Sequence, residues 1–256
     1  MIVLDNLTKY YGSALAVDRV SIVIPSGQLV GYLGPNGAGK STTVKMLTGM
    51  MAPTSGQAAI YGLDTQRDNT EVKRITGYVP ESGAVYETLT GREYLEMVGR
   101  LYGMDDSIIT DRISKFGDFF ELSRDTLDRK LLSAYSKGMR QKVVISAGLI
   151  HNPRVIFFDE PLNGLDASTQ LMFKTLIKNL AAEGKTILYC SHMLDIVERT
   201  CDRIIIIDKG RVVADGTLAE LQASSGKGSL EQIFNKLTAQ TDLEERAEVF
   251  SKTFSF

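Results

Sequence analysis

A glycine-rich segment carries the strongest chemical signal in the sequence. Residues 34–41 read Gly-Pro-Asn-Gly-Ala-Gly-Lys-Ser, which matches G-x-x-x-x-G-K-[ST] directly after an apolar run and before a helical pattern. Gly34, Gly37 and Gly39 permit backbone conformations closed to other residues, so that successive N–H groups point at one phosphate. The positive end of a helix dipole adds to the attraction, because the helix begins at the same place.

The last residues of this segment complete a site for a magnesium triphosphate. Lys40 supplies a full positive charge to the β- and γ-phosphates, and the Ser41 hydroxyl can ligate Mg²⁺. The predicted nucleotide-binding residues here are Gly34, Pro35, Asn36, Gly37, Ala38, Gly39, Lys40, Ser41 and Thr42.

An acidic pair follows a second apolar run. Residues 155–158 read as a buried strand that ends in Asp159, Glu160 and a proline. A carboxylate at the carboxyl end of a strand beside the glycine-loop strand can hold Mg²⁺ through water, and Asp159 is predicted in that role. Glu160 points differently and can polarise an attacking water. A polar turn is the alternative explanation of the triplet taken alone, and the nearby glycine-rich loop argues against it.

Short β-rich runs alternate with helical ones, which is typical of an α/β protein with a mostly parallel sheet. Continuous apolar runs indicate strands covered on both faces. Those runs are residues 29–33, 155–158, 186–190 and 203–207, and the helix after the first spans residues 39–50. We therefore predict a P-loop nucleoside triphosphatase core.

Two regions depart from this rhythm. Residues 2–9 and 19–25 predict an N-terminal antiparallel β subdomain, and Lys209-Gly210 predicts a hairpin turn into residues 211–214. Between about 82 and 150 helical periodicity replaces the strand pattern, which predicts an inserted α-helical subdomain. Its two apolar stripes are Tyr94, Leu95, Val98, Leu101 and Tyr102, and Ile109, Ile113, Phe116 and Phe120.

The C-terminal segment is predicted to be a helical tail over residues 223–256, after an ATP-binding domain over 1–222. Residues 223–228 are rich in Ser and Gly and indicate a linker. Capping boxes at Ser229 and Thr241 then predict two helices, the first with an apolar face. Packing on the chain's own core and contact with a partner subunit both remain open. The apolar residues of the first helix are Leu230, Ile233, Phe234 and Leu237.

The bulk composition narrows the possible partners. The chain has 256 residues and a net charge of −2, which gives no field to draw it onto nucleic acid. No run approaches the roughly 18 apolar residues of a membrane span, and the start lacks a signal-peptide pattern. We expect a cytoplasmic protein without a nucleic-acid partner.

In this order the motifs resemble the ATP-binding subunit of the ABC transporter family, over about residues 2–222. Residues 135–141, Tyr-Ser-Lys-Gly-Met-Arg-Gln, stand where the family has a Leu-Ser-Gly-Gly-Gln signature. Ser136 and Gly138 are kept, whereas Lys137 and Met139 differ. Ser136 suits a helix N-cap, and the helix start with Lys137 can bind an anion, although a simple capped helix also explains it. The resemblance implies that residues 136–139 contact the γ-phosphate held by a second subunit.

The resemblance implies further roles at single positions. Tyr11 matches the aromatic residue that stacks on adenine, unless it is an ordinary strand-end tyrosine. Asp166 lies in the loop that communicates across the dimer, and His192 matches the residue that contacts the γ-phosphate and supports Glu160. The other histidine, His151, is explained by charge complementarity at a helix end.

Glu81 replaces the glutamine of most family members at the joint between core and helical insertion. The family's amide oxygen approaches Mg²⁺ there, and a carboxylate binds the metal more strongly but adds negative charge. The predicted metal ligands are thus Ser41, Glu81 and Asp159. Glu81 and the altered signature resemble the exporter branch that includes drug, antibiotic and sodium extrusion systems.

The function implied is ATP hydrolysis, with ATP and Mg²⁺ as cofactors, that powers export through a separate integral membrane permease. A second ATP-binding subunit, identical or related, is expected, at the inner face of the membrane. Tyr86 and Leu89 are candidate permease contacts.

Two alternatives remain open, a non-transport ABC-type ATPase and an importer. The signature and Ser191-His192 argue against a phosphotransferase that shares only the phosphate loop, and the presence of Lys40, Asp159, Glu160 and His192 argues against an inactive regulatory subunit.

Overall fold

A six-stranded sheet forms the centre of the protein, and the computed structural model describes residues 1–81, 84–226 and 228–238. The strand order is β10-β9-β3-β8-β7-β6, and each neighbouring pair is parallel except β9 with β10. The predicted fold class is confirmed. The strands are β3 (Leu29–Leu33), β6 (Thr76–Val79), β7 (Val155–Asp159), β8 (Thr186–Cys190), β9 (Arg203–Asp208) and β10 (Arg211–Gly216).

The apolar runs are continuous because both faces of this sheet are covered. In β7, Val155 and Phe157 enter one hydrophobic core, whereas Ile156 and Phe158 enter the other. Side chains of a strand point alternately to opposite faces, so two cores require apolar residues at every position. The hairpin into β10 is also as predicted, with positive φ angles at Lys209 (46°) and Gly210 (79°).

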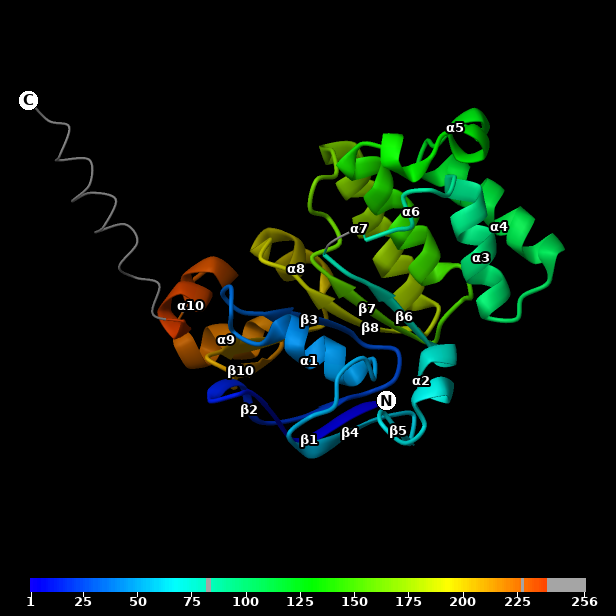
Figure 1. Ribbon diagram of the computed structural model, residues 1–256. Helices are drawn as coiled ribbons and strands as arrows, with labels where there is room; N and C mark the ends of the chain where they lie inside the picture. Colours follow the sequence, from blue (N-terminus) through cyan, green and yellow to red (C-terminus); the bar gives the residue numbers. More distant parts are fainter. Residues whose placement is uncertain (82–83, 227, 239–256) are drawn as a thin grey trace, which may run out of the picture.

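A second, antiparallel sheet has the order β2-β1-β4-β5. Helix α1 (Lys40–Leu47) lies between the two sheets, where its Val44 and Leu47 join the core (Figure 1). The predicted antiparallel subdomain is present, but β2 begins earlier than expected and β4 and β5 were not predicted. The strands are β1 (Ile2–Tyr11), β2 (Ala14–Ile24), β4 (Ser55–Ile60) and β5 (Leu63–Asp64).

Four α-helices follow one another in the region predicted to be a helical insertion. Within residues 91–149, all of which the structure describes, no strand interrupts them. Two members of the predicted stripes are exposed: Leu101, the last residue of its helix, is 79% exposed, and Tyr102, directly after it, is 36% exposed. The helices are α3 (Gly91–Leu101), α4 (Asp106–Phe119), α5 (Arg124–Arg129) and α6 (Lys137–Leu149).

His151 does not complement a helix end as expected. Its ring stacks on Tyr102 with centroids 3.6 Å apart, and its Nε2 lies 3.0 Å from the Thr76 carbonyl oxygen. Burial lowers the pKa of His151 to about 4, so the ring is neutral near pH 7. The cation at the end of α6 is instead Arg112, whose guanidinium donates to the Ile150 carbonyl oxygen.

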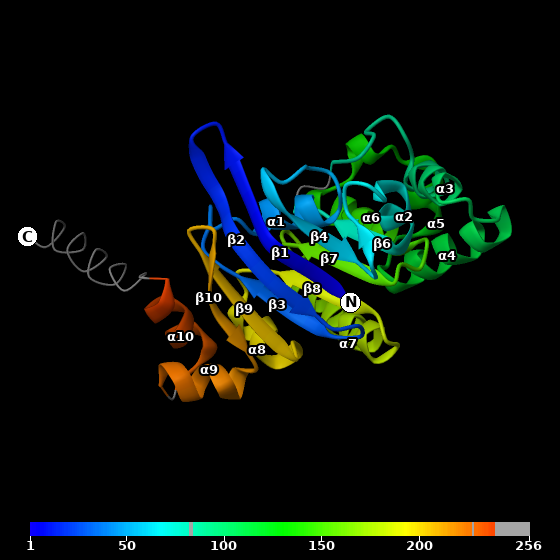
Figure 2. The same cartoon turned by 90° about the horizontal axis from the view of Figure 1, so that it is seen from below.

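The C-terminal part of the described chain packs on its own core. Helix α9 (Leu218–Ser225) extends into the predicted linker, so the first half of that linker is helical. A capping box at Ser229 opens α10 (Leu230–Leu237), as predicted, and Leu230, Ile233 and Phe234 are buried in the main core. The two helices lie side by side next to α8 (Leu194–Thr200) (Figures 1 and 2). The second predicted tail helix, from Thr241, lies outside the described residues.

The remaining helices cover the edges and the other face of the central sheet (Figure 1). None of the helices in the described ranges is both long and apolar enough to cross a lipid bilayer. These helices are α2 (Asn69–Ile75), α7 (Ala167–Ala182), α8 (Leu194–Thr200), α9 (Leu218–Ser225) and α10 (Leu230–Leu237).

Candidate nucleotide site

The glycine-rich loop connects β3 to the first turn of α1. Gly37 and Gly39 have φ angles of 80° and 106°, the left-handed region that favours glycine. Gly39 occupies the N-cap position of α1 and gives it no side-chain cap, so the first N–H groups of the helix have no side-chain competitor. Gly34 is required for another reason than predicted: a Cβ there would collide with the Ile207 carbonyl oxygen.

Lys40 is held beneath this loop. Its side chain is almost fully buried, and its ammonium donates hydrogen bonds to the carbonyl oxygens of Gly34 (2.6 Å) and Pro35 (3.2 Å). These contacts satisfy a buried cation with neutral groups only. Among the described residues, the Lys40 ammonium has no negatively charged hydrogen-bond partner, and an anion that enters the loop would supply one.

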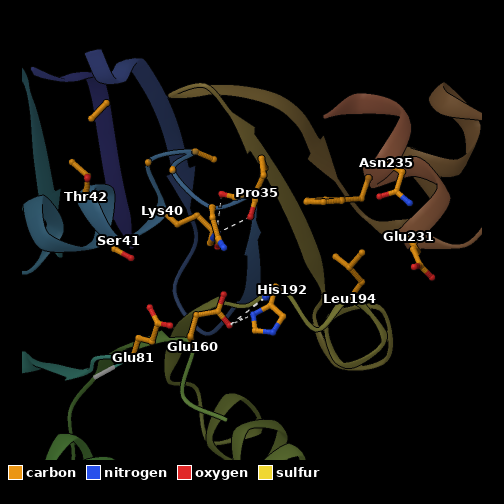
Figure 3. Close-up of a pocket in the computed structure, with 17 residues that line it drawn as sticks. Pro35, Lys40, Ser41, Thr42, Glu81, Glu160, His192, Leu194, Glu231 and Asn235 are labelled. Atoms are coloured by element: carbon orange, nitrogen blue, oxygen red, sulfur yellow. Dashed lines mark hydrogen bonds and ion pairs between the residues drawn. The ribbon is translucent and has the colours of Figure 1, made fainter. Parts of the chain in front are cut away.

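The loop opens onto a cavity of about 630 Å³ (Figure 3). Every predicted loop residue from Gly34 to Thr42 lines this cavity, together with Glu81, Glu160 and His192. The glycine-rich loop, Glu160 and His192 come from different parts of the chain. The parallel strands that precede them bring all three to the carboxyl ends of the sheet. The other lining residues are Ala16, Leu194, Glu231, Phe234 and Asn235.

Contacts to its backbone and to its carboxylate hold Glu160 in place. It has a φ of 50°, and its N–H donates to the Cys190 carbonyl oxygen at 3.0 Å. Its Oε2 lies 2.8 Å from Nδ1 of His192 and accepts a bond of 3.3 Å from the backbone N–H of that residue. The strained backbone position and the His192 contact direct the carboxylate into the cavity.

The environment of Glu160 suits a proton acceptor. Burial raises the pKa of the carboxyl group, and the neighbouring His192 and Lys40 partly offset that rise. A base is most effective when its pKa approaches the working pH. The Glu160–His192 pair can therefore hold and polarise a water molecule beside a bound phosphate.

Asp159 lies at the carboxyl end of β7, and it does not line the cavity itself. One expectation is wrong here: β7 is not adjacent to β3, because β8 pairs with both. Asp159 is 3% exposed, and its Oδ1 has no hydrogen-bond partner among the described residues. Burial raises its pKa, and the Ser41 hydroxyl offsets part of the rise. A buried carboxylate oxygen without a donor is the group that a cation would satisfy.

Glu81 follows β6 and completes an oxygen-rich set with Ser41 and Asp159. Its Oε1 accepts a hydrogen bond of 3.2 Å from the Asn163 side chain. The described residues contain no group of three acidic, histidine or cysteine side chains arranged for a metal. Magnesium usually takes only one or two carboxylates and completes its shell with water and phosphate, so these three residues fit Mg²⁺.

Tyr11 is placed beside the cavity rather than in its wall. It ends β1 and is 48% exposed, and its hydroxyl donates to the sulfur of Met51 at 3.1 Å. The same hydroxyl lies 3.5 Å from Oγ1 of Thr42, which does line the cavity. The ring is thus accessible next to the loop, and stacking on a base remains a prediction.

The signature residues lie outside their own chain's cavity. Ser136 caps α6 as predicted, and its hydroxyl accepts from the Met139 N–H at 3.2 Å. A Cβ at Gly138 would lie 2.8 Å from the Gly164 carbonyl oxygen, and the Lys137 side chain packs on Gly164. The signature therefore packs against the Gly164 part of the loop after β7, and none of residues 136–139 lines the cavity.

Asp166 acts as a helix cap in this chain. Its carboxylate accepts from the Thr169 N–H (2.9 Å) and from the hydroxyls of Thr169 (2.7 Å) and Ser168 (2.5 Å). These hydrogen bonds hold the pKa of Asp166 well below its usual range. A role across a dimer remains a prediction for this residue.

Two positioning residues were missed from the sequence. Gln141 is buried in α6, and its amide donates to the carbonyl oxygens of Pro161 (3.2 Å) and Pro80 (3.4 Å). Asn163 holds Glu81, as described above. The signal was available, since a glutamine that precedes the apolar run of α6 has to find polar partners in the core.

The glycine loop opening a helix, the buried lysine and the acidic residues at one edge of a parallel sheet define a P-loop nucleoside triphosphatase.

Comparison with known proteins narrows this class. The ABC transporter family matches residues 17–163. ABC transporter ATP-binding protein NatA of Bacillus subtilis (strain 168) is 40% identical over 221 residues, 86% of this chain and 89% of NatA. Daunorubicin/doxorubicin resistance ATP-binding protein DrrA of Streptomyces peucetius is 38% identical over 226 residues, 88% of this chain and 68% of DrrA.

A solved structure agrees with these relatives. The dimeric post-hydrolysis state of the ATP-binding cassette MJ0796, bound to ADP and Pi, has a TM-score of 0.78 at 27% identity and covers 85% of this chain and 99% of that one. The chain belongs to the ABC transporter family, as one of its ATP-binding subunits. It is an ATPase, and the family prediction is confirmed.

Proposed function

We propose that two ATP-binding subunits, this chain and an identical or related copy, close around ATP and power export through a separate membrane permease. Hydrolysis then reopens the pair. The observation that carries the proposal is the separation of two elements in one chain. Residues 136–139 form the start of α6, and none of them lines the cavity formed by residues 34–42. A second copy can bring its signature to that cavity.

Each residue of the site has a role that follows from its position. The loop N–H groups and Lys40 bind the phosphates, and Glu160 takes the proton of the attacking water while His192 positions Glu160. Ser41, Asp159 and Glu81 would hold Mg²⁺, which neutralises phosphate charge when bound. Catalysis of this kind rests mainly on positioning and charge stabilisation.

Several contacts connect the cavity to the helical region. Asn163 holds Glu81, and Gln141 of α6 bonds to both Pro80 and Pro161. A change at Glu81 or at the end of β7 therefore acts directly on the helix that carries the signature. We infer that this network passes the state of the nucleotide to α6.

The permease contact is proposed at the outer side of the same network. A hollow of about 410 Å³ lies where α3 and α6 meet β6, and Tyr94 and Tyr102 line it. Tyr86 precedes α3 in the sequence and is 63% exposed, and the centroid of its ring lies 6.4 Å from that of the Tyr94 ring. Exposed aromatic side chains around a hollow favour a protein contact. Leu89, half-buried beside Tyr86, is the second candidate contact.

The direction of transport and the location rest on the relatives. DrrA is described as a resistance protein, which supports export of a compound from the cell. Glu81 and the altered signature resemble the same exporter branch. A subunit that uses ATP at a permease works at the cytoplasmic face of the membrane, and we propose that location.

Purification from membranes tests this function. The tagged full-length chain, expressed in its own cell, should retain an integral membrane protein through detergent extraction. Tyr86→Ala should lower the amount retained, whereas Leu101→Ala, which changes an even more exposed apolar residue at the end of α3, should not. Recovery of no membrane protein, together with full ATPase activity, would contradict the transport function while leaving the ATPase intact.

A further inference from the structure

Helix α10 lines the nucleotide cavity, although it contains none of the motifs by which the sequence resembles the family. Glu231, Phe234 and Asn235 face the cavity on the side where His192 and Leu194 lie. In Figure 3 Glu231 and Asn235 lie across the pocket from Ser41 and Thr42, beyond Leu194. The C-terminal part of the described chain is therefore a wall of the site.

This wall is held in place by packing. Leu230, Ile233 and Phe234 are buried, and the Leu230 N–H donates to the Glu198 carboxylate of α8 at 3.3 Å. On the opposite side the Lys236 ammonium donates to the Ser225 carbonyl oxygen of α9 at 2.8 Å. The position of the polar residues on α10 is thus fixed relative to His192, which lies two residues before α8.

The charge of the cavity is unusual for a site that takes a polyanion. Among its lining residues, all within the described ranges, three are glutamates and Lys40 is the single lysine or arginine. Glu160 and Glu81 have roles beside water and metal in the proposed function. Glu231 is exposed and has neither role, and no group of the described residues forms a hydrogen bond or an ion pair with its carboxylate.

We propose that α10 is an electrostatic wall of the nucleotide site, in which Glu231 weakens binding of metal-free nucleotide more than binding of its magnesium complex. The inference rests on the proposed function, since it requires ATP in this cavity. A fixed charge acts in proportion to the charge of the ligand. Metal-free ATP carries about four negative charges and its magnesium complex about two, so the wall favours the form that can be hydrolysed.

Two substitutions on one helix face test the wall. Glu231 and Asn235 are four residues apart, so they share a face. Glu231→Gln removes a charge and should tighten Mg-ATP about threefold and ATP in EDTA about ninefold, because the logarithm of the effect doubles with ligand charge. Asn235→Asp adds a charge and should weaken both, again more strongly without metal. Raising the salt concentration should shrink all these changes.

Calorimetric titration of the full-length chain measures them, with Glu183→Gln, an exposed glutamate remote from the cavity, as the matched control. Unchanged affinities in both variants, or an equal gain for metal-free and magnesium-bound ATP after Glu231→Gln, would overturn the wall. If the unmodified chain binds no ATP at all, the proposed function itself fails, and the inference fails with it.

Discussion

Two helix starts in this molecule look alike in sequence but differ in structure. Helices α1 and α6 each begin with a lysine, Lys40 and Lys137, after a short polar or glycine-rich segment. Both carry the same positive dipole end. Gly39 leaves α1 without a side-chain cap and Lys40 is buried at the cavity, whereas Ser136 caps α6 and Lys137 is exposed.

The difference teaches where an anion site is complete. At α1 the free N–H groups, the buried Lys40 and Glu160, which directly follows β7, meet within one chain. At α6 the cap already satisfies one N–H group, and the neighbouring groups come from the Gly164 loop. A helix dipole is common to all helices, and the groups around it decide whether it binds phosphate. We expect α6 to contribute to binding only in a pair of subunits.

The largest effect should come from a substitution at Glu160, which lines the cavity at the start of α1. Glu160→Gln removes the proton acceptor and should lower steady-state phosphate release by about 100-fold or more, with ATP binding retained. Glu81→Gln is the matched control in the same cavity and restores the residue of most family members; it should keep turnover within about tenfold. Undiminished turnover in Glu160→Gln would remove Glu160 from the chemistry.

Substitution of Lys40 and of Lys137 tests the difference between the starts of α1 and α6 most directly. Lys40→Ala should weaken ATP binding by about 10- to 100-fold, because a hydrogen bond to a charged group is lost in a buried site. Lys137→Ala should leave the affinity of a monomer unchanged, since Lys137 is exposed outside the cavity. Equilibrium titration at low protein concentration compares them. Equal losses in both variants would contradict the assignment of the phosphate site to α1.

The pH dependence sharpens the account of Glu160. A base works only when ionised, so turnover is lost as pH falls through its pKa in the folded protein. Burial raises that pKa, and the His192 contact lowers it. His192→Ala should therefore move the acid limb of the rate profile to higher pH and reduce turnover about 10- to 100-fold. A limb that stays in place or moves to lower pH would contradict the positioning role of His192.

The smallest effect concerns the cap of α6. Ser136→Ala and Ser123→Ala each remove an N-cap, from α6 and α5, and each should lower the free energy of unfolding by about 1 kcal/mol. Only Ser136→Ala should also weaken ATP-dependent dimerisation of the Glu160→Gln protein, measured by sedimentation. If both substitutions affect the dimer equally, the signature acts through stability alone.

Much of the fold was predictable because the decisive signals are local. Apolar runs such as residues 155–158 identified strands covered on both faces, and the loop of residues 34–41 has a spacing with one physical explanation. The capping box at Ser229 likewise depends on residues three apart. Such patterns determine local structure without information about distant partners.

What could not be predicted depends on which distant segments meet. Strand β8 lies between β3 and β7, and no local pattern states the strand order. The contact of Asn163 with Glu81 requires that order, and so does the approach of α10 to the cavity. The neutral state of His151 was missed because burial by Tyr102 comes from a separate helix.

A crystal structure of the Glu160→Gln protein with Mg-ATP tests the central claim most directly. The account predicts the triphosphate on the loop of residues 34–42, with the metal between Ser41 and Asp159. It also predicts that Ser136 of a second copy faces the γ-phosphate. Nucleotide bound elsewhere, or a metal remote from Asp159, would contradict it.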